Sequence, residues 1–256
     1  MKGMSFQLFL GVIMISLVHA EPLKVFICAG QSNMKGVRTE QAQLPSELAE
    51  QSENFVFVKK GSKPGEWRAL TAENNQSKGF GPELSFAKEM SAYLGEPIGI
   101  VKHSVGGTQL ATRWNPDGES SLYQVLLQKF RDAQQQKEIQ VIGMIWMQGE
   151  ADSKNVKHAA AYKENLERFV ARSRRDFSEM PFIAGRVNPP KSKKYVAPEV
   201  VRAAQETAAI QQYAYVNCDE LTKVADGVHY DTTGTIELGK LFAQKMIAQL
   251  ENRADK

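Results

Sequence analysis

The amino-acid sequence predicts a single-domain α/β fold, a three-layer α/β/α sandwich around a central parallel sheet. Short apolar runs rich in β-favouring residues alternate along the chain with longer segments whose apolar residues have helical spacing. One such run, residues 141–146, is apolar on both faces, which is typical of parallel strands covered by helices on both sides. No linker, repeat or low-complexity tract divides the sequence, so we expect one domain.

The first twenty residues have the features of a secretory signal peptide. Lys2 supplies a positive start, residues 6–18 are largely apolar, and Val18-His19-Ala20 is a small-residue cleavage site before Glu21. We therefore expect a signal peptide at residues 1–20, a domain at 21–256, and export to the periplasm or the medium. The apolar stretch is too short to span a membrane comfortably and no later one is longer, so we expect no stable membrane insertion.

The first strand is expected at residues 24–29, a mostly apolar run that stops at Gly30. Residues 55–58, with the sequence FVFV, form the expected second strand. Residues 61–81 are rich in Gly, Lys, Asn and Ser and predict a long surface loop. Trp67 within this loop would serve either as a platform for a sugar ring or as a packing anchor.

The remaining strands share the short, apolar, β-favouring character and are expected at residues 98–103, 141–146, 182–185 and 214–217. The helices share apolar residues spaced along one face and are expected at residues 82–94, 120–130, 156–176, 198–213 and 233–250. Pro82 and Pro198 favour helix starts, since a first helical residue needs no N–H, and Ser120 is a candidate N-cap.

Charge and cysteine content exclude some classes of protein. Lys and Arg number 32 and Asp and Glu 29, a near balance that argues against a nucleic-acid partner, which would require a clustered basic face. Cys28 falls in the first strand and Cys218 at the end of a late one. Because those strands are central and peripheral in a doubly wound sheet, we expect two unpaired, buried thiols.

Polar or glycine-rich turns follow three of the expected strands, around Ser32, Gly106 and Gln148. Because the carboxyl ends of parallel strands meet at one edge of a sheet, we expect these turns to converge there, where open α/β sheets place their ligand sites. Ser32 is in the position of a nucleophile; the alternative is that it merely caps the next helix.

A base for such a serine is expected from the loop before the last helix. Removal of the signal leaves His103, His158 and His229, and His229 stands three residues after Asp226. A carboxylate at that spacing can orient an imidazole and stabilise its protonated form. The alternatives are helix capping and a metal site formed with Asp231, but no HExxH, Cys pair or EF-hand motif supports metal binding, so we expect neither metal nor cofactor.

Four motifs in order resemble the sequence blocks of the SGNH hydrolase superfamily. They are residues 30–34 (GQSNM), 106–108 (GGT), 146–150 (WMQGE) and 226–229 (DGVH). The resemblance extends over essentially the whole chain after the signal. It is closest to the carbohydrate-esterase branch that includes sialic-acid-specific acetylesterases and acetylxylan esterases, and it implies a flavodoxin-like three-layer fold.

The resemblance implies a role for each site residue. Ser32 would be the nucleophile, His229 the base and Asp226 the group that orients it. The backbone N–H groups of Ser32 and Gly106 would form an oxyanion hole with the side chain of Gln148, which stands where the superfamily has Asn. Each such donor contributes about 2.7–4 kcal/mol to stabilising the transition state of ester cleavage.

Substrate contacts are expected from Gln31, Gly107, Arg113, Trp114 and Glu150, near the same turns; Gly107 is also the second choice for the oxyanion hole. The implied reaction removes an O-acetyl group from a carbohydrate, sialic acid or acetylated xylan, through an acetyl-enzyme. An arginine here would suit a carboxylate-bearing sugar, or it would form a structural ion pair. The alternatives are an acyl-chain esterase or thioesterase, and a non-catalytic glycan-binding protein.

Overall fold

The computed structural model describes residues 21–50, 52–59, 61, 63–74 and 78–254, so the predicted signal peptide lies outside the described residues. These residues form a seven-stranded sheet with the strand order β3-β2-β4-β1-β5-β6-β7. The strands are β1 (Leu23–Gly30), β2 (Phe55–Val58), β3 (Glu66–Ala69), β4 (Gly99–Ser104), β5 (Ile139–Met147), β6 (Phe182–Arg186) and β7 (Tyr213–Asn217). All neighbours are parallel except β3, which runs antiparallel to β2 at the edge of the sheet.

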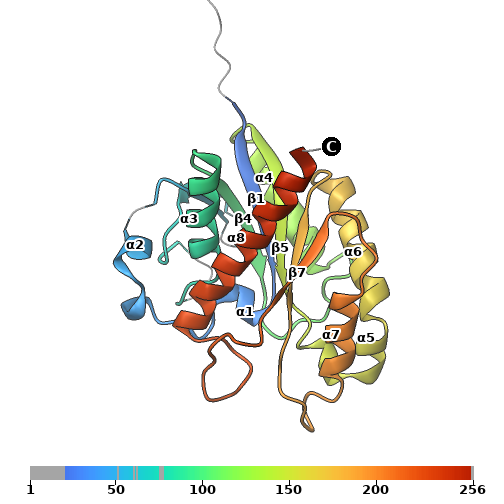
Figure 1. The fold of residues 1–256 in the computed structure, drawn as a ribbon. Helices are drawn as coiled ribbons and strands as arrows, with labels where there is room; N and C mark the ends of the chain where they lie inside the picture. The colour runs from blue at the N-terminus through green and yellow to red at the C-terminus, as the bar shows by residue number, and fades with distance from the viewer. Residues whose placement is uncertain (1–20, 51, 60, 62, 75–77, 255–256) are drawn as a thin grey trace, which may run out of the picture.

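Helices cover both faces of the sheet (Figure 1). They are α1 (Ser32–Lys35), α2 (Ser46–Ala49), α3 (Glu83–Leu94), α4 (Leu122–Gln134), α5 (Val156–Ala160), α6 (Tyr162–Asp176), α7 (Pro198–Glu206) and α8 (Thr232–Ala254). On one face α3 and α8 lie side by side, and on the other α4, α6 and α7 pack against the sheet. The predicted α/β sandwich is therefore confirmed. No described helix is long and apolar enough to cross a membrane.

Strand β1 is the centre of the core. Its residues 25–29 are completely buried, because helices cover both of its faces. Phe26 meets Phe86 of α3 edge to face at 5.0 Å between ring centroids. On the other face of the sheet Trp146 of β5 packs on Phe169 of α6 at 4.5 Å. Each fully buried aromatic side chain of this kind contributes about 1.5–3 kcal/mol, so the core fixes β1, and with it the turn that carries Ser32.

The predicted surface loop at residues 61–81 contains strand β3, which the sequence analysis missed. Trp67 of this strand packs edge to face on Phe57, with 5.4 Å between ring centroids, and its Nε1–H donates to the carbonyl of Ala133 at 3.3 Å. The structure therefore supports the packing role of Trp67 rather than that of a sugar platform.

The helix predicted at residues 198–213 is too long. Helix α7 ends at Glu206, and the chain turns through Gln212, which has a φ of +49°, to enter β7. The helix predicted at residues 156–176 is divided into α5 and α6 at Ala161, and Ser121 rather than Ser120 caps α4, accepting a hydrogen bond from the N–H of Gln124.

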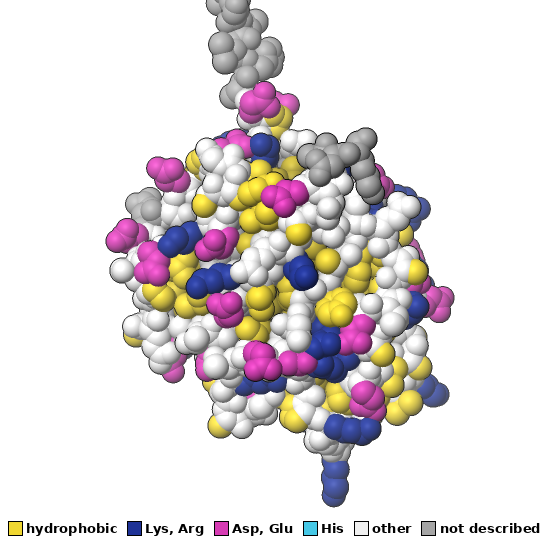
Figure 2. Space-filling view, in the orientation of Figure 1, with side chains coloured by type: hydrophobic (Ala, Val, Ile, Leu, Met, Phe, Trp, Pro, Cys, Tyr) yellow, Lys and Arg dark blue, Asp and Glu magenta, His cyan; other side chains and the backbone are white. Residues whose placement is uncertain are grey.

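Both cysteines are unpaired and buried, as predicted: Cys28 lies on central β1, and Cys218 follows the edge strand β7. On the face shown in Figure 2, Lys and Arg side chains are interspersed with Asp and Glu side chains.

The crossing of α3 and α8 provides a test of the packing. A Cβ atom added to Gly239 would lie 2.0 Å from Ser85 Oγ and 2.2 Å from the carbonyl oxygen of Pro82, so the two helices would have to separate. We expect Gly239→Ala to cost about 1–3 kcal/mol of stability, as overpacking does, and to lower the Tm measured by circular dichroism. The exposed neighbour Lys240 provides the control, since Lys240→Ala should leave the Tm unchanged; an equal Tm for both variants would contradict this packing.

Candidate active site

The turn after β1 is fixed by a close approach to the end of β5. Gly30 has a φ of +149°, and a Cβ atom there would lie 2.1 Å from the carbonyl oxygen of Met147. Only glycine fits this position. The N–H of Gln31 donates to the same carbonyl at 2.9 Å, and Ser32 then begins α1. The strand ends thus place the Ser32 hydroxyl at the carboxyl edge of the sheet.

Ser32, His229 and Asp226 meet at this edge. His229 Nε2 lies 3.0 Å from Ser32 Oγ, and His229 Nδ1 lies 2.7 Å from Asp226 Oδ2. The N-cap of α1 is Gln31, and Ser32 is the first residue inside the helix, which disfavours the capping alternative. The site is shallow: Ser32 is 6% exposed, and the side chains of His229 and Asp226 are 24% and 37% exposed.

The Asp226 carboxylate is held on both oxygens. Its Oδ1 accepts hydrogen bonds from the N–H groups of Val228 at 2.8 Å and His229 at 2.9 Å, while Oδ2 meets the imidazole. Partial burial by itself raises the pKa of Asp226, but the hydrogen bonds from His229 and Val228 outweigh it and lower the pKa to about 2. An ionised carboxylate can only accept, so Nδ1 carries the proton and Nε2 presents its lone pair to Ser32.

The carboxamide of Asn33 joins the serine turn to the histidine loop. Its Nδ2 donates to the carbonyl of Val228 at 3.1 Å, and its Oδ1 accepts from the N–H of Tyr230 at 3.1 Å. These two backbone groups flank His229 on either side. The sequence analysis assigned no role to Asn33; its position directly after the candidate nucleophile was the available signal.

The buried carboxylate of Glu150 orients Asn33 through a hydrogen bond. Its Oε1 accepts from Asn33 Nδ2 at 2.6 Å, and its side chain is only 2% exposed. Its Oε2 is buried without a hydrogen-bond partner among the described residues. Burial raises the pKa of Glu150, against the lowering effect of its hydrogen bonds. Glu150 therefore does not face the surface, where the sequence analysis placed it as a substrate contact.

The backbone N–H groups of Ser32 and Gly106 are the candidate donors of an oxyanion hole. A Cβ atom added to the exposed Gly106 would lie 3.7 Å from Ser32 Cβ, so the glycine turn after β4 adjoins the serine. Ser32 is the first residue of α1, where an N–H has no intrahelical acceptor. Within the described part of the chain, the N–H groups of Ser32 and Gly106 donate no hydrogen bond. Both are free to bind an oxyanion.

The side chain of Gln148 has a different position from the one expected. Its Nε2 donates to the carbonyl of Thr108 at 2.8 Å and to Asp152 Oδ2 at 2.5 Å, and its side chain is fully buried. An amide nitrogen has two hydrogens, so in this structure none is left for an oxyanion. Asp152 also accepts from the N–H groups of Leu110 at 2.9 Å and Ala111 at 3.3 Å. Gln148 and Asp152 thus anchor the loop that carries Gly106.

The expected substrate contacts divide into two groups. Gly107 and Arg113 are exposed on the loop after β4. Gln31 is 3% exposed, and its side chain accepts from the N–H of Ala151. Trp114 is fully buried: its ring packs on Trp146 and its Nε1–H donates to Thr108 Oγ1 at 2.9 Å. Trp114 therefore belongs to the core and does not contact substrate, because its packing partners cover it.

The geometry disfavours the metal alternative for the histidine loop. Asp231 Oδ1 accepts from Thr222 Oγ1 at 2.6 Å and from the N–H of Gly234 at 2.8 Å, so this carboxylate caps α8 instead of joining His229. Among the described residues, no group of three or more His, Cys, Asp or Glu side chains is placed to hold a metal ion.

Comparison with known proteins places the chain in a family. The profile of the family described as carbohydrate esterase, sialic acid-specific acetylesterase, matches residues 22–248. A probable carbohydrate esterase from Arabidopsis thaliana is 25% identical over 246 residues, which cover 89% of this chain and 91% of the relative.

Several solved structures share the fold. A protein from Arabidopsis thaliana has a TM-score of 0.75 at 24% identity, with 91% of this chain and 99% of the other covered. NanS has a TM-score of 0.71 at 15% identity, with 94% and 100% covered. A carbohydrate acetylesterase from Xanthomonas citri has a TM-score of 0.63 at 24% identity, with 86% and 55% covered. The fold expected from the SGNH hydrolase motifs is confirmed.

The hydrogen bonds of Asn33 predict how the site responds to its loss. Without the carboxamide, the backbone on both sides of His229 loses a partner, and the imidazole is no longer held against Ser32. We expect Asn33→Ala to slow the labelling of Ser32 by a fluorophosphonate about 10- to 100-fold, as a displacement of about 1 Å does in other sites. Mass spectrometry of the labelled peptide measures the rate. The control is Asn115→Ala, since the side-chain amide of Asn115 lies in a loop and accepts from the N–H of Asp117; this variant should be labelled at the wild-type rate. Wild-type labelling of a folded Asn33→Ala variant would contradict the positioning role.

Proposed function

Since the chain belongs to the carbohydrate esterase family of sialic acid-specific acetylesterases, and is therefore an enzyme that hydrolyses ester bonds, we propose that it is an exported serine esterase. It removes O-acetyl groups from carbohydrates through an acetyl-enzyme. The observation that carries this proposal is the continuous hydrogen-bonded series from Ser32 Oγ through His229 to Asp226. Export rests on the sequence of residues 1–20.

Acylation begins with attack of Ser32 Oγ on the acetyl carbonyl carbon. His229 Nε2, 3.0 Å away, takes the hydroxyl proton as the Oγ–C bond forms. The ionised Asp226 stabilises the imidazolium, which it contacts through Nδ1 at 2.7 Å. The N–H groups of Ser32 and Gly106 bind the oxyanion of the tetrahedral intermediate. When this intermediate collapses, the imidazolium gives its proton to the sugar oxygen, the C–O bond breaks, and the acetyl group stays on Ser32.

Deacylation repeats the same steps with water. His229 removes a proton from a water molecule, the resulting nucleophile attacks the acetyl carbonyl, and Ser32 Oγ leaves with the proton returned by the imidazolium. The partial exposure of His229 and Asp226 gives water direct access to the base. The products are acetate and the regenerated serine.

The shape and charge of the site support a sugar leaving group. Its shallow position suits a bulky polar alcohol better than a long acyl chain, which would need an apolar groove. Arg113 is exposed and forms no salt bridge among the described residues, which supports binding of a carboxylate-bearing sugar such as sialic acid over neutral acetylated xylan.

Removal of the nucleophile tests the mechanism. We expect Ser32→Ala to reduce acetate release from p-nitrophenyl acetate by at least about 10⁴-fold, because no acetyl-enzyme can form. The Tm should stay at the wild-type value, since the change removes one small hydroxyl. Substantial turnover by the folded variant would contradict the serine mechanism. So would wild-type activity that disappears with EDTA and returns with added divalent cation.

The role of Arg113 predicts the substrate preference. We expect Arg113→Ala to lower kcat/KM for O-acetylated sialic acid about 10-fold relative to its kcat/KM for p-nitrophenyl acetate, since only the sugar has a carboxylate to lose its partner. Arg168, exposed on α6 with an Asn165 partner, provides the matched control, and Arg168→Ala should keep the wild-type ratio. Faster acetate release from acetylated xylan than from O-acetylated sialic acid would exclude the sialic acid preference.

A further inference from the structure

A cavity separate from the Ser32 site opens at the carboxyl edge of the sheet, on the face covered by α4. It has a volume of about 590 Å³, and its polar lining includes Lys59, His103, Ser120, Ser121, Gln124 and Lys129. Lys59 follows β2, His103 is near the end of β4, and the two serines precede α4. The triad described above contributes none of its residues to this lining.

Lys129 is a buried cation without a carboxylate partner. Its side chain, on α4, belongs to a residue that is only 6% exposed, and Nζ donates to the carbonyl of Lys102 at 2.8 Å. Its two neighbouring lysines are paired, Lys102 with Glu83 and Lys59 with Asp132. No carboxylate in the described ranges forms a salt bridge with Lys129. A buried charge is costly unless it is paired, so the ammonium of Lys129 would be stabilised by an anion bound in the cavity.

The ammonium of Lys129 remains charged at neutral pH. Burial, and then repulsion by Lys102 and Lys59, lower the pKa of Lys129 to about 8, which still leaves the protonated form dominant at pH 7. Among the described residues that line the cavity, the only acidic one is Glu119, which is exposed and lies three residues before α4. The positive end of the helix dipole of α4 adds to the positive potential.

The other polar groups of the cavity suit a sugar. Burial and the charge of Lys129 lower the pKa of His103 to about 4, so its imidazole is neutral at pH 7, and its Nε2 is buried without a hydrogen-bond partner among the described residues. The hydroxyls of Ser120 and Ser121 and the amide of Gln124 can bind sugar hydroxyls. Val125 adds an exposed apolar surface of the kind that the C–H face of a sugar ring covers.

This cavity lies close to the esterase centre. His103 is three residues before Gly106, which adjoins Ser32, and three residues of extended chain span at most about 10 Å. A saccharide of more than one ring could therefore extend from Ser32 toward the cavity.

We propose that the cavity is a second binding site that takes an oxyanion carried on a saccharide, a carboxylate or a phosphate, with Lys129 as its counter-charge. The proposal does not depend on the chemistry at Ser32. The site binds the negatively charged unit, and the hydroxyl and amide groups around Lys129 bind its ring.

Isothermal titration calorimetry with defined sugars tests the proposal. The probes are digalacturonate, galactose 6-phosphate and neutral lactose. We expect the wild type to bind at least one of the charged probes and to bind lactose at least 10-fold more weakly. The charged probe that binds more tightly identifies the source of the oxyanion. Absence of binding for both charged probes at millimolar concentration, or equally tight binding of lactose, would overturn the proposal.

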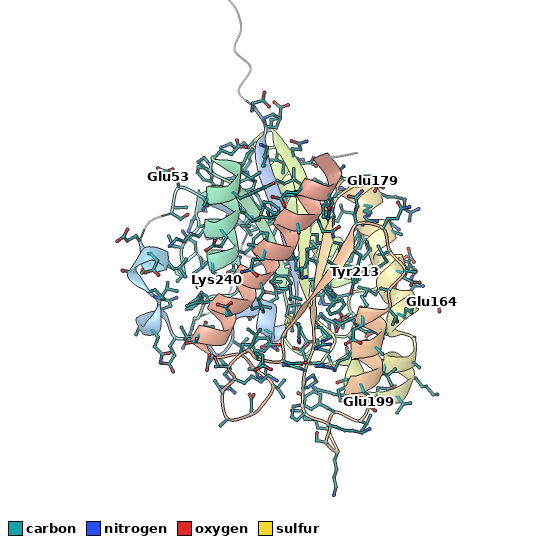
Figure 3. All side chains as sticks on the ribbon, in the orientation of Figure 1. Glu53, Glu164, Glu179, Glu199, Tyr213 and Lys240 are labelled. Carbon is teal, nitrogen blue, oxygen red and sulfur yellow. The ribbon has the colours of Figure 1, made fainter. Side chains whose placement is uncertain are left out.

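Two variants locate the binding. Lys129→Met removes the charge while keeping the bulk of the side chain, and it should weaken binding of the charged probe at least 10-fold with no loss of Tm. Lys240→Met, on α8 over the opposite face of the sheet, is the matched control and should bind like the wild type (Figure 3). Equal affinity for the Lys129 and Lys240 variants would place the binding elsewhere and refute the assignment.

If Lys129→Met does not fold, a substitution at the surface of the cavity tests the same proposal. Ser120 is exposed and lies just before the N-cap of α4, where an acidic side chain is compatible with the helix dipole, so Ser120→Asp should fold. Its charge at the cavity should weaken binding of the charged probe at least 10-fold, and unchanged affinity would count against the site. Titration of the Ser32→Ala variant with the charged probe separates this proposal from the esterase proposal. Its affinity for the probe should match that of the wild type, whether or not the wild type is an esterase.

Discussion

The structure of the candidate site depends on one side-chain amide. Asn33 donates to the carbonyl of Val228 and accepts from the N–H of Tyr230, across separations of 195 and 197 residues in the sequence. The amide lies next to Ser32, and the backbone groups it binds lie next to His229. A single short polar side chain therefore connects the turn of Ser32 to the loop of His229, and the buried Glu150 in turn accepts a hydrogen bond from that side chain. At one end of this connection the sheet fixes Asn33 through β1, and at the other end the backbone groups belong to the loop before α8.

Much of the fold could be predicted from the sequence because the strands that matter most are the most apolar. Strand β1 is buried on both faces, and its continuous apolar run indicates that directly. Strand β3 escaped prediction because its four residues alternate between exposed and half-buried positions at the edge of the sheet, within a polar segment. The end of α7 escaped prediction because the helical pattern of residues 198–213 continues past it. The helix stops at Glu206, and the chain then turns through Gln212 to reach β7, a constraint that arises from tertiary structure.

The candidate site was predictable where chemistry depends on residue type and spacing, and unpredictable where it depends on neighbours. Asp226 and His229 are three residues apart, and a local turn is enough to bring them together. The sequence analysis assigned Trp114 to substrate contact and Gln148 to the oxyanion hole, but each is buried and held by a partner from another element, Trp146 for Trp114 and Thr108 for Gln148. The sequence alone does not show that the N–H donors of these two side chains are already taken by hydrogen bonds inside the protein.

The position of His229 in the loop before α8 has a consequence for biosynthesis. Ser32 Oγ and His229 Nε2 meet across 197 residues, so the serine emerges from the ribosome long before the imidazole that lies beside it in the folded chain. While synthesis is under way, the Ser32 hydroxyl has no imidazole neighbour from this loop. The pair forms only when the loop docks, so the contact between these two side chains requires residues from both ends of the domain.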